Sequence, residues 1–109
     1  MAEVNASIMG PVRRFLRALQ EHGISVDAAY LFGSCAKGVE GLWSDIDVAV
    51  ISSSISDDRF EERIRFTKLS SQIDSRIEPV PFSPETFVDE DPLAYEIKKE
   101  GIRIEYSAH

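Results

Sequence analysis

The chain has 109 residues, of which 43% are hydrophobic and 28% charged, and 19 acidic against 12 basic residues give a net charge of −7. This length fits one domain over residues 1–109, and no apolar run reaches the ~18 residues that a membrane-spanning helix needs. The acidic excess argues against direct binding to long nucleic acids, which relies on Lys and Arg at the phosphates. A single cysteine excludes an internal disulfide, and the N-terminus has no signal-peptide pattern, so we expect a cytoplasmic protein.

The first predicted element is an amphipathic helix over residues 6–22, because apolar side chains recur there at helical spacing. Its predicted buried face consists of Ile8, Val12, Phe15, Leu16 and Leu19. Asn5 and Ser7 are both suitable capping residues, whereas Pro11 would suit a later start, since proline is favoured in the first helical turn. Gly23 is expected to end this helix.

Two strands and a second helix are predicted next. Residues 26–32 and 45–52 are rich in apolar side chains, and the second of these segments is β-branched and nearly continuous, which is typical of strands. The second helix is predicted over residues 57–74, with Asp57 and Asp58 favourably placed at its N-terminal end. The residues expected to supply most of its buried side are Phe60, Ile64, Leu69 and Ile73.

Two prolines distinguish the third predicted strand, residues 76–82. Pro79 and Pro81 are two residues apart, so both remove hydrogen-bond donors from the same side of the strand. The other side keeps its donors, and the sequence therefore predicts an edge strand with a single neighbour.

The chain closes with a predicted helix over residues 91–100, ended by Gly101, and a strand over residues 102–106. The elements then follow the order helix, strand, strand, helix, strand, helix, strand. That order indicates an α/β or α+β sheet domain rather than a helical bundle.

Two carboxylates stand at the start of the segment 45–52. Asp45 and Asp47 project from the same face of the predicted strand, roughly 6–7 Å apart. Without a cation they would repel each other, and a divalent metal would remove that repulsion. Oxygen ligands with room for water and phosphate suit Mg²⁺. The alternative is a solvated strand end, because a bare Asp-x-Asp pattern is common.

Gly33 and Ser34 follow the first predicted strand. Glycine there lets a phosphate approach the backbone, whose N–H groups, with the Ser34 hydroxyl, can bind the phosphate oxygens. Lys37 adds a positive charge as a phosphate-contact candidate. The alternative for this segment is a tight Gly-Ser turn. Nothing beside Cys35 marks it as a nucleophile, so we expect no catalysis by it.

Glu78, on the predicted edge strand, is the candidate for a third carboxylate. The alternative for this residue is a purely protective role, because charged side chains commonly guard edge strands.

In combination, Gly33-Ser34-x-Ala36-x-Gly38, a spacer, and then Ser44-Asp45-Ile46-Asp47 before an apolar strand resemble the minimal nucleotidyltransferase family, part of the DNA polymerase beta-like nucleotidyltransferase superfamily. The resemblance extends over almost the whole chain. It implies a single nucleotidyltransferase domain, with a small mixed β-sheet and helices packed on it.

The resemblance also implies roles for the candidate residues. Gly33 and Ser34 would bind the triphosphate of ATP, and Asp45 and Asp47 would hold two Mg²⁺ ions. Glu78 occupies the position of a third carboxylate, where the family more often has Asp. A hydroxyl would attack the α-phosphate in line, with pyrophosphate leaving and Glu78 helping to deprotonate the nucleophile.

Many small proteins of this family are antitoxins of HEPN ribonuclease toxins, and members can transfer AMP to a tyrosine near the toxin active site. The resemblance therefore implies a HEPN-type toxin as partner, in a homo- or hetero-oligomer. Two alternatives stay open: an antitoxin that acts by binding without catalysis, and a transferase for a small hydroxyl-bearing molecule. We expect the short chain to leave little room for a second substrate pocket.

Overall fold

The computed structural model describes residues 6–33 and 45–105. The elements occur in the predicted order: α1 (Ala6–Glu21), β1 (Ala28–Phe32), β2 (Ile46–Ile51), α2 (Arg59–Ser71), β3 (Ile77–Phe82), α3 (Pro92–Glu100) and β4 (Ile102–Arg103). The last strand is shorter than expected, and residue 106 of that prediction lies outside the described part of the chain. Within residues 6–33 and 45–105, no helix has the length and apolar character needed to span a membrane.

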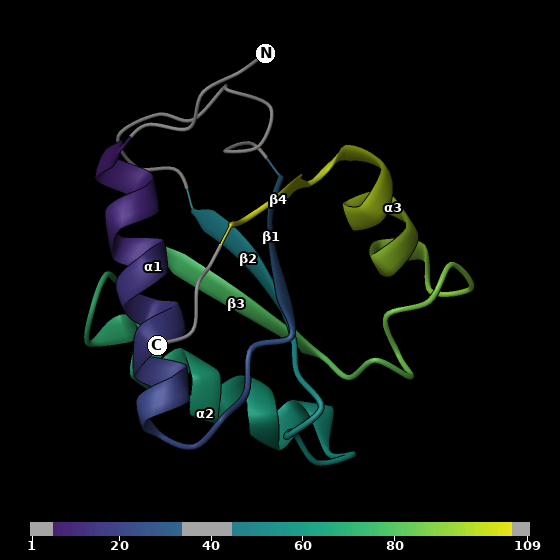
Figure 1. Cartoon of the computed structure of the whole chain (residues 1–109), viewed down its shortest axis with the longest axis horizontal. Coiled ribbons are helices and arrows are strands. Elements are labelled where there is room, and N and C mark those ends of the chain that lie inside the picture. The colour runs from purple at the N-terminus through teal and green to yellow at the C-terminus, as the bar shows by residue number, and fades with distance from the viewer. Residues whose placement is uncertain (1–5, 34–44, 106–109) are drawn as a thin grey trace.

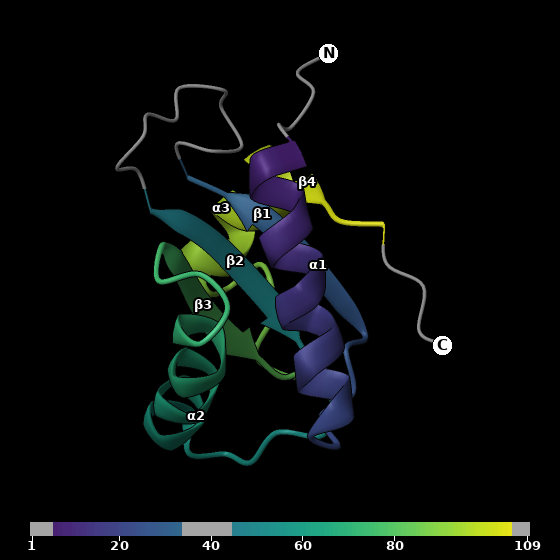
Figure 2. The ribbon, with the colours of Figure 1, turned by 90° about the vertical axis from the view of Figure 1, so that its left-hand side faces the viewer.

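The strands form one mixed sheet in the order β3-β2-β1-β4 (Figure 1). Strand β1 runs antiparallel to β2 and β4, whereas β2 and β3 run parallel. The expected α+β class with helices packed on a small mixed sheet is therefore confirmed. Helices α1 and α2 cover one face of this sheet, and α3 lies against the other (Figure 2).

Among the strands of the described residues, β3 is an edge strand that pairs with β2 alone, as its prolines predict. The N–H groups of Ile46 and Ser52 donate to the carbonyls of Arg76 and Phe82, at 2.7 and 2.8 Å. Even-numbered residues of β3 thus bond toward β2, so Pro79 and Pro81 direct their missing donors away from the sheet. The two prolines leave the β2–β3 ladder intact.

Helix α1 buries the face that its periodicity predicts, with Ile8, Val12, Phe15, Leu16 and Leu19 each no more than 3% exposed. It begins at Ala6, so Pro11 lies inside the helix rather than at its start. Proline has no N–H to give to the carbonyl four residues earlier, that of Ser7. The Arg76 guanidinium donates to this Ser7 carbonyl at 3.3 Å, which offsets the lost helical bond. Gly23, with φ of +80°, follows the helix as predicted.

Helix α2 turns a different face inward from the one predicted. Phe60 is 76% exposed and Ile64 41% exposed, while Phe66, Glu62 and Ser70 are buried. Leu69 and Ile73 are partly buried, in agreement with the prediction. Glu62 tolerates burial because its carboxylate accepts from the backbone N–H of Ser56 at 2.8 Å and pairs with Arg65 at 3.2 Å.

Candidate active site

The candidate carboxylates meet where the end of β1 lies beside the starts of β2 and β3. In the sheet register, Asp47 of β2 stands opposite Phe32 of β1 on one side and Glu78 of β3 on the other. Residues paired across parallel strands project from the same face, so Asp47 and Glu78 share one face of the sheet. The topology thus brings together two carboxylates that are 31 residues apart in the sequence (78 − 47).

That face is the one covered by α3. Alternation along β2 sends Ile46, Val48 and Val50 into the core beneath α1 and α2, so Asp47 points to the opposite side. Farther along the same face, Ala49 and Ile51 pack with Ala94 and Ile97 of α3. The apolar end of this face is therefore covered, and the carboxylates lie at its other end.

The charges of Asp45 and Glu78 act electrostatically on Asp47. Partial burial raises the pKa of Asp47 above its ordinary value, and the negative charges of Asp45 and Glu78 raise it further. The positive charge of Arg63 partly opposes these effects. Asp45 is exposed immediately before β2, whereas Asp47 and Glu78 are intermediate in exposure. The site is a cluster of like charges with incomplete compensation.

Gly33 closes β1 in direct contact with this cluster. Its φ is +74°, in the left-handed region that favours glycine, and a Cβ atom built on it would collide with Oδ2 of Asp47. From the sequence alone, this glycine is explained by the need for a phosphate to approach the backbone. The structure adds a second reason, which is that the Asp47 carboxylate occupies the space of the absent side chain.

Ser34 and Lys37, the other predicted phosphate contacts, lie outside the described residues, as does Cys35. Their roles stay predictions.

Arg63 of α2 is a residue that the sequence did not single out. It is exposed on its helix, yet its charge reaches Asp47 on β2. Helical periodicity identifies Arg63 only as a solvent-facing residue, because the packing of α2 against the sheet decides which charges lie near it.

As to metal binding, the described residues contain no group of three His, Cys, Asp or Glu side chains close enough to hold one ion by themselves. A magnesium ion does not require such a group, because it is usually bound by one or two carboxylates together with water and substrate phosphates. The donor set of Asp45, Asp47 and Glu78 consists of carboxylate oxygen atoms. It therefore has the chemistry that fits Mg²⁺.

Comparison with known proteins agrees with this geometry. The model of the family described as nucleotidyltransferase domain matches residues 12–104. No curated protein sequence matches the chain.

Solved structures share the fold at low sequence identity. A crystal structure of a toxin-antitoxin with AMP-PNP has a TM-score of 0.63 at 23% identity, over 90% of this chain and 73% of that one. A mutant of the toxin-antitoxin MntA-HpeT has a TM-score of 0.62 at 22% identity, over 96% and 75%. A Sulfolobus solfataricus protein described as a nucleotidyltransferase has a TM-score of 0.52 at 18% identity, over 94% and 89%.

Proposed function

This chain belongs to the nucleotidyltransferase domain family, with the polymerase beta-like fold, and from that membership we propose that it transfers AMP from ATP to a hydroxyl of a partner protein. One observation carries the proposal: Asp47 lies against Gly33, opposite Glu78, and within the electrostatic reach of Asp45. A fold gains nothing from like charges gathered at a half-buried position, so their presence is best explained by a cationic ligand.

Asp45 and Asp47 would hold two Mg²⁺ ions, with Glu78 as the third carboxylate. The ions, when bound, would neutralise charge on the phosphates and on the leaving pyrophosphate. Arg63 supplies positive charge near Asp47 and does not replace the metal, since burial and the two neighbouring carboxylates still raise the pKa of Asp47.

The residues of this chain would act as follows. Gly33 and Ser34 would hold the triphosphate through backbone N–H groups and the serine hydroxyl, with Lys37 as an additional contact. Glu78 would accept the proton of the acceptor hydroxyl as its oxygen attacks the α-phosphorus. The bond from that phosphorus to the bridging oxygen then breaks, and pyrophosphate leaves.

For the acceptor we propose a HEPN-type ribonuclease toxin, with this chain as its antitoxin in the cytoplasm. Two solved structures that share the fold are toxin-antitoxin pairs, and one of them was crystallised with AMP-PNP. A protein partner would form a hetero-oligomer with this chain. The net charge of −7 is compatible with a partner that handles RNA, because such proteins present basic surfaces.

A second candidate function is an antitoxin that neutralises by binding alone. The observation that favours it is Glu78 itself, which is one methylene longer than the Asp that the family more often has at this position. The absence of a closed three-residue metal cluster among the described residues is compatible with this candidate as well.

The deciding experiment incubates the protein with ATP, Mg²⁺ and its cognate toxin, identified from the adjacent reading frame, and weighs the toxin by intact mass spectrometry. We expect an adenylate adduct with the wild type and a loss of about 10³-fold in rate with the Asp45→Asn/Asp47→Asn double variant. The exposed carboxylate Asp57 provides a matched control, and Asp57→Asn should modify the toxin normally.

The same variants separate the two candidates. If the wild type leaves no adduct, transfer to the toxin is excluded. If the double variant is folded and still neutralises the toxin, binding alone explains the antitoxin effect.

A further inference from the structure

Helix α2 carries an apolar surface that no described element covers. Phe60, 76% exposed, and Ile64, 41% exposed, are one turn apart and therefore adjacent on the helix surface. They line a groove of about 330 Å³ together with Arg63, Thr67 and Lys68. We call this set of five residues the α2 groove. Phe60 and Ile64 thus present adjacent apolar side chains to solvent beside two cations, which offers apolar and charged contacts to a partner.

The α2 groove is locally basic in an acidic chain. Among the described residues, its lining contains two cations and no carboxylate, although the chain as a whole has a net charge of −7. Within the described residues, neither Arg63 nor Lys68 forms an ion pair. The other α2 cations are engaged, Arg59 with Asp91 and Arg65 with Glu62.

The α2 groove lies on the helix that packs against the edge strand of the candidate site. Arg63 lines the groove and also acts electrostatically on Asp47. Helix α2 packs along β3, the edge strand that carries Glu78. Because α2 covers the face of the sheet opposite Asp47 and Glu78, a polypeptide lying in the groove would reach the carboxylates around the β3 edge.

We propose that the α2 groove docks the acceptor protein, through a segment that presents an apolar side chain flanked by Asp or Glu. The apolar side chain packs on Phe60 and Ile64, and the acidic groups pair with Arg63 and Lys68. This inference rests on the proposed function, because it names the surface that holds the acceptor protein.

Charge favours an acidic segment of a partner protein in the α2 groove over a second copy of the chain or a nucleic acid. A second copy of the chain also carries −7, so two copies repel each other at long range. A nucleic acid needs many phosphate contacts, and the two cations of the groove supply too few. An acidic segment on a protein partner satisfies both the apolar and the basic residues.

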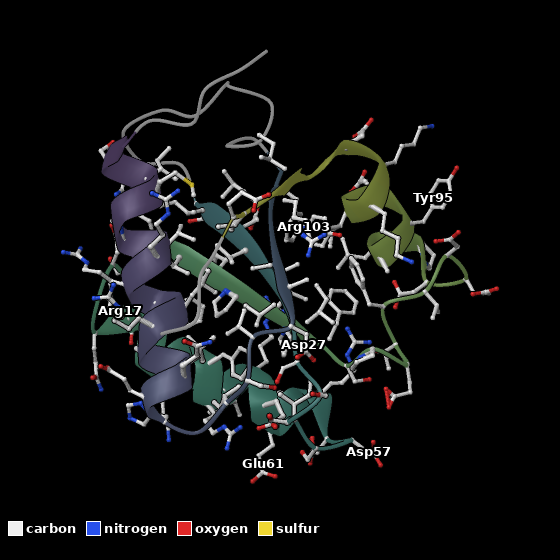
Figure 3. The ribbon with its side chains drawn as sticks, viewed as in Figure 1. Arg17, Asp27, Asp57, Glu61, Tyr95 and Arg103 are labelled. Atoms are coloured by element: carbon white, nitrogen blue, oxygen red, sulfur yellow. The ribbon has the colours of Figure 1, made fainter. Side chains whose placement is uncertain are left out.

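The test uses Ile64→Asp and Lys68→Glu, with Tyr95→Asp and Lys99→Glu as matched controls. Tyr95 is 50% exposed on α3 and points outward, far from Glu61 of α2 (Figure 3). Binding of each full-length variant to the purified cognate toxin is measured by calorimetry without ATP. The adenylation rate, the affinity for a fluorescent ATP analogue and the melting temperature are then measured for the same proteins.

We expect each groove variant to weaken toxin binding by about tenfold or more and to raise the KM for the toxin. Its melting temperature and ATP affinity should match those of the wild type, and the α3 controls should bind normally. Binding by Lys68→Glu should also depend less on salt concentration than binding by the wild type.

The inference would be overturned if the groove variants bound the toxin like the wild type, or if the α3 controls lost as much affinity. It would also be overturned if the wild type formed dimers that Ile64→Asp dissociates, because a second copy of the chain would then occupy the groove. If the groove variants formed the adenylate adduct with an unchanged KM for the toxin, docking in the α2 groove would be excluded, whereas AMP transfer to the toxin would still be supported. If those variants lost toxin binding and the wild type formed no adduct, docking in the α2 groove would be supported and AMP transfer to the toxin would be excluded.

Discussion

The two faces of the sheet serve different purposes. The face under α1 and α2 is closed by apolar side chains from β1, β2 and β3, including Leu31, Val48 and Ile77, all of which are buried. The face under α3 is apolar at one end and carries Asp47 and Glu78 at the other. The first face supplies the stability that allows the second to keep like charges together, as functional sites commonly do at the expense of local stability.

The largest effect is expected from a substitution in the hydrophobic core between the sheet and helices α1 and α2. Phe66 is fully buried there and meets Phe15 edge to face, with 6.4 Å between the ring centroids. Phe66→Ala should lower the free energy of unfolding by about 3–5 kcal/mol, through lost burial and a residual cavity. Urea denaturation monitored by circular dichroism measures this change.

The matched control lies on the same helix. Phe60 is 76% exposed, so Phe60→Ala should change stability by no more than about 0.5 kcal/mol. Equal losses in the two variants would show that the structure has assigned the wrong face of α2 to the core.

A second prediction concerns the close approach of the Asp47 carboxylate to the backbone of Gly33. Gly33→Ala places a methyl group against Asp47 Oδ2 and imposes a positive φ on alanine, so we expect a loss of about 2–3 kcal/mol. Gly23→Ala separates the two causes, because Gly23 also has a positive φ of +80° but no atom of a described residue within 4 Å of the added Cβ. Its loss should be limited to about 1 kcal/mol.

Thermal melts of the two glycine variants in the same buffer make this comparison. An equal loss at both positions would show that the contact between Gly33 and Asp47 is unimportant.

The third prediction concerns the loss of folding stability caused by the Asp47 charge on the α3 side of the sheet. The pKa of Asp47 is raised in the folded protein, so the folded state binds its proton more tightly than the unfolded state. Stability without divalent metal should therefore fall as the pH rises from the ordinary value of 3.8 through the raised pKa. Asp47→Asn should remove this fall and melt at a slightly higher temperature at neutral pH.

Melting curves of the wild type and Asp47→Asn between pH 3.5 and 8, with a chelator present, test the sign of this effect. A lower melting temperature for Asp47→Asn at neutral pH would assign Asp47 a structural role instead.

The smallest effect is expected on the α1/α2 side, where Asp74 orients Arg76 toward α1. Their ion pair is 2.7 Å long, and hydrogen bonds from Arg76 hold the pKa of Asp74 below its ordinary value. Asp74→Asn should cost about 0.5–1 kcal/mol above pH 3.8, since the pair is partly exposed. The cost should disappear as the pH falls through the lowered pKa, where the wild-type carboxyl is protonated as well.

Chemical denaturation at pH 7 and at low pH compares the two proteins. A cost that persists unchanged at low pH would indicate that the charge of Asp74 is irrelevant.

Much of the fold could be predicted from the sequence where one rule decided the outcome. The spacing of apolar residues identified the buried face of α1, and the positions of Pro79 and Pro81 identified β3 as an edge strand. The face of α2 could not be predicted in this way. Glu62 is buried because Ser56 and Arg65 satisfy its carboxylate, and such compensation leaves no trace in hydrophobic periodicity.

For the candidate site, the sequence identified the carboxylates and the glycine but not their surroundings. Asp45, Asp47 and Glu78 could be named as candidates from residue type and strand position. The electrostatic effect of Arg63 on Asp47 depends on how α2 packs against the sheet, and the accommodation of a carboxylate by Gly33 depends on the register of β1 and β2. Both are consequences of tertiary packing.

The outward-facing prolines of β3 constrain how any partner can recognise this edge of the molecule. A foreign strand aligned along β3 would find no N–H at Pro79 or Pro81, so main-chain pairing cannot extend the sheet there. Recognition by strand addition, common among peptide-binding domains, is closed to this edge. Selectivity near Glu78 must then reside in side chains, where single substitutions can retune it without disturbing the sheet.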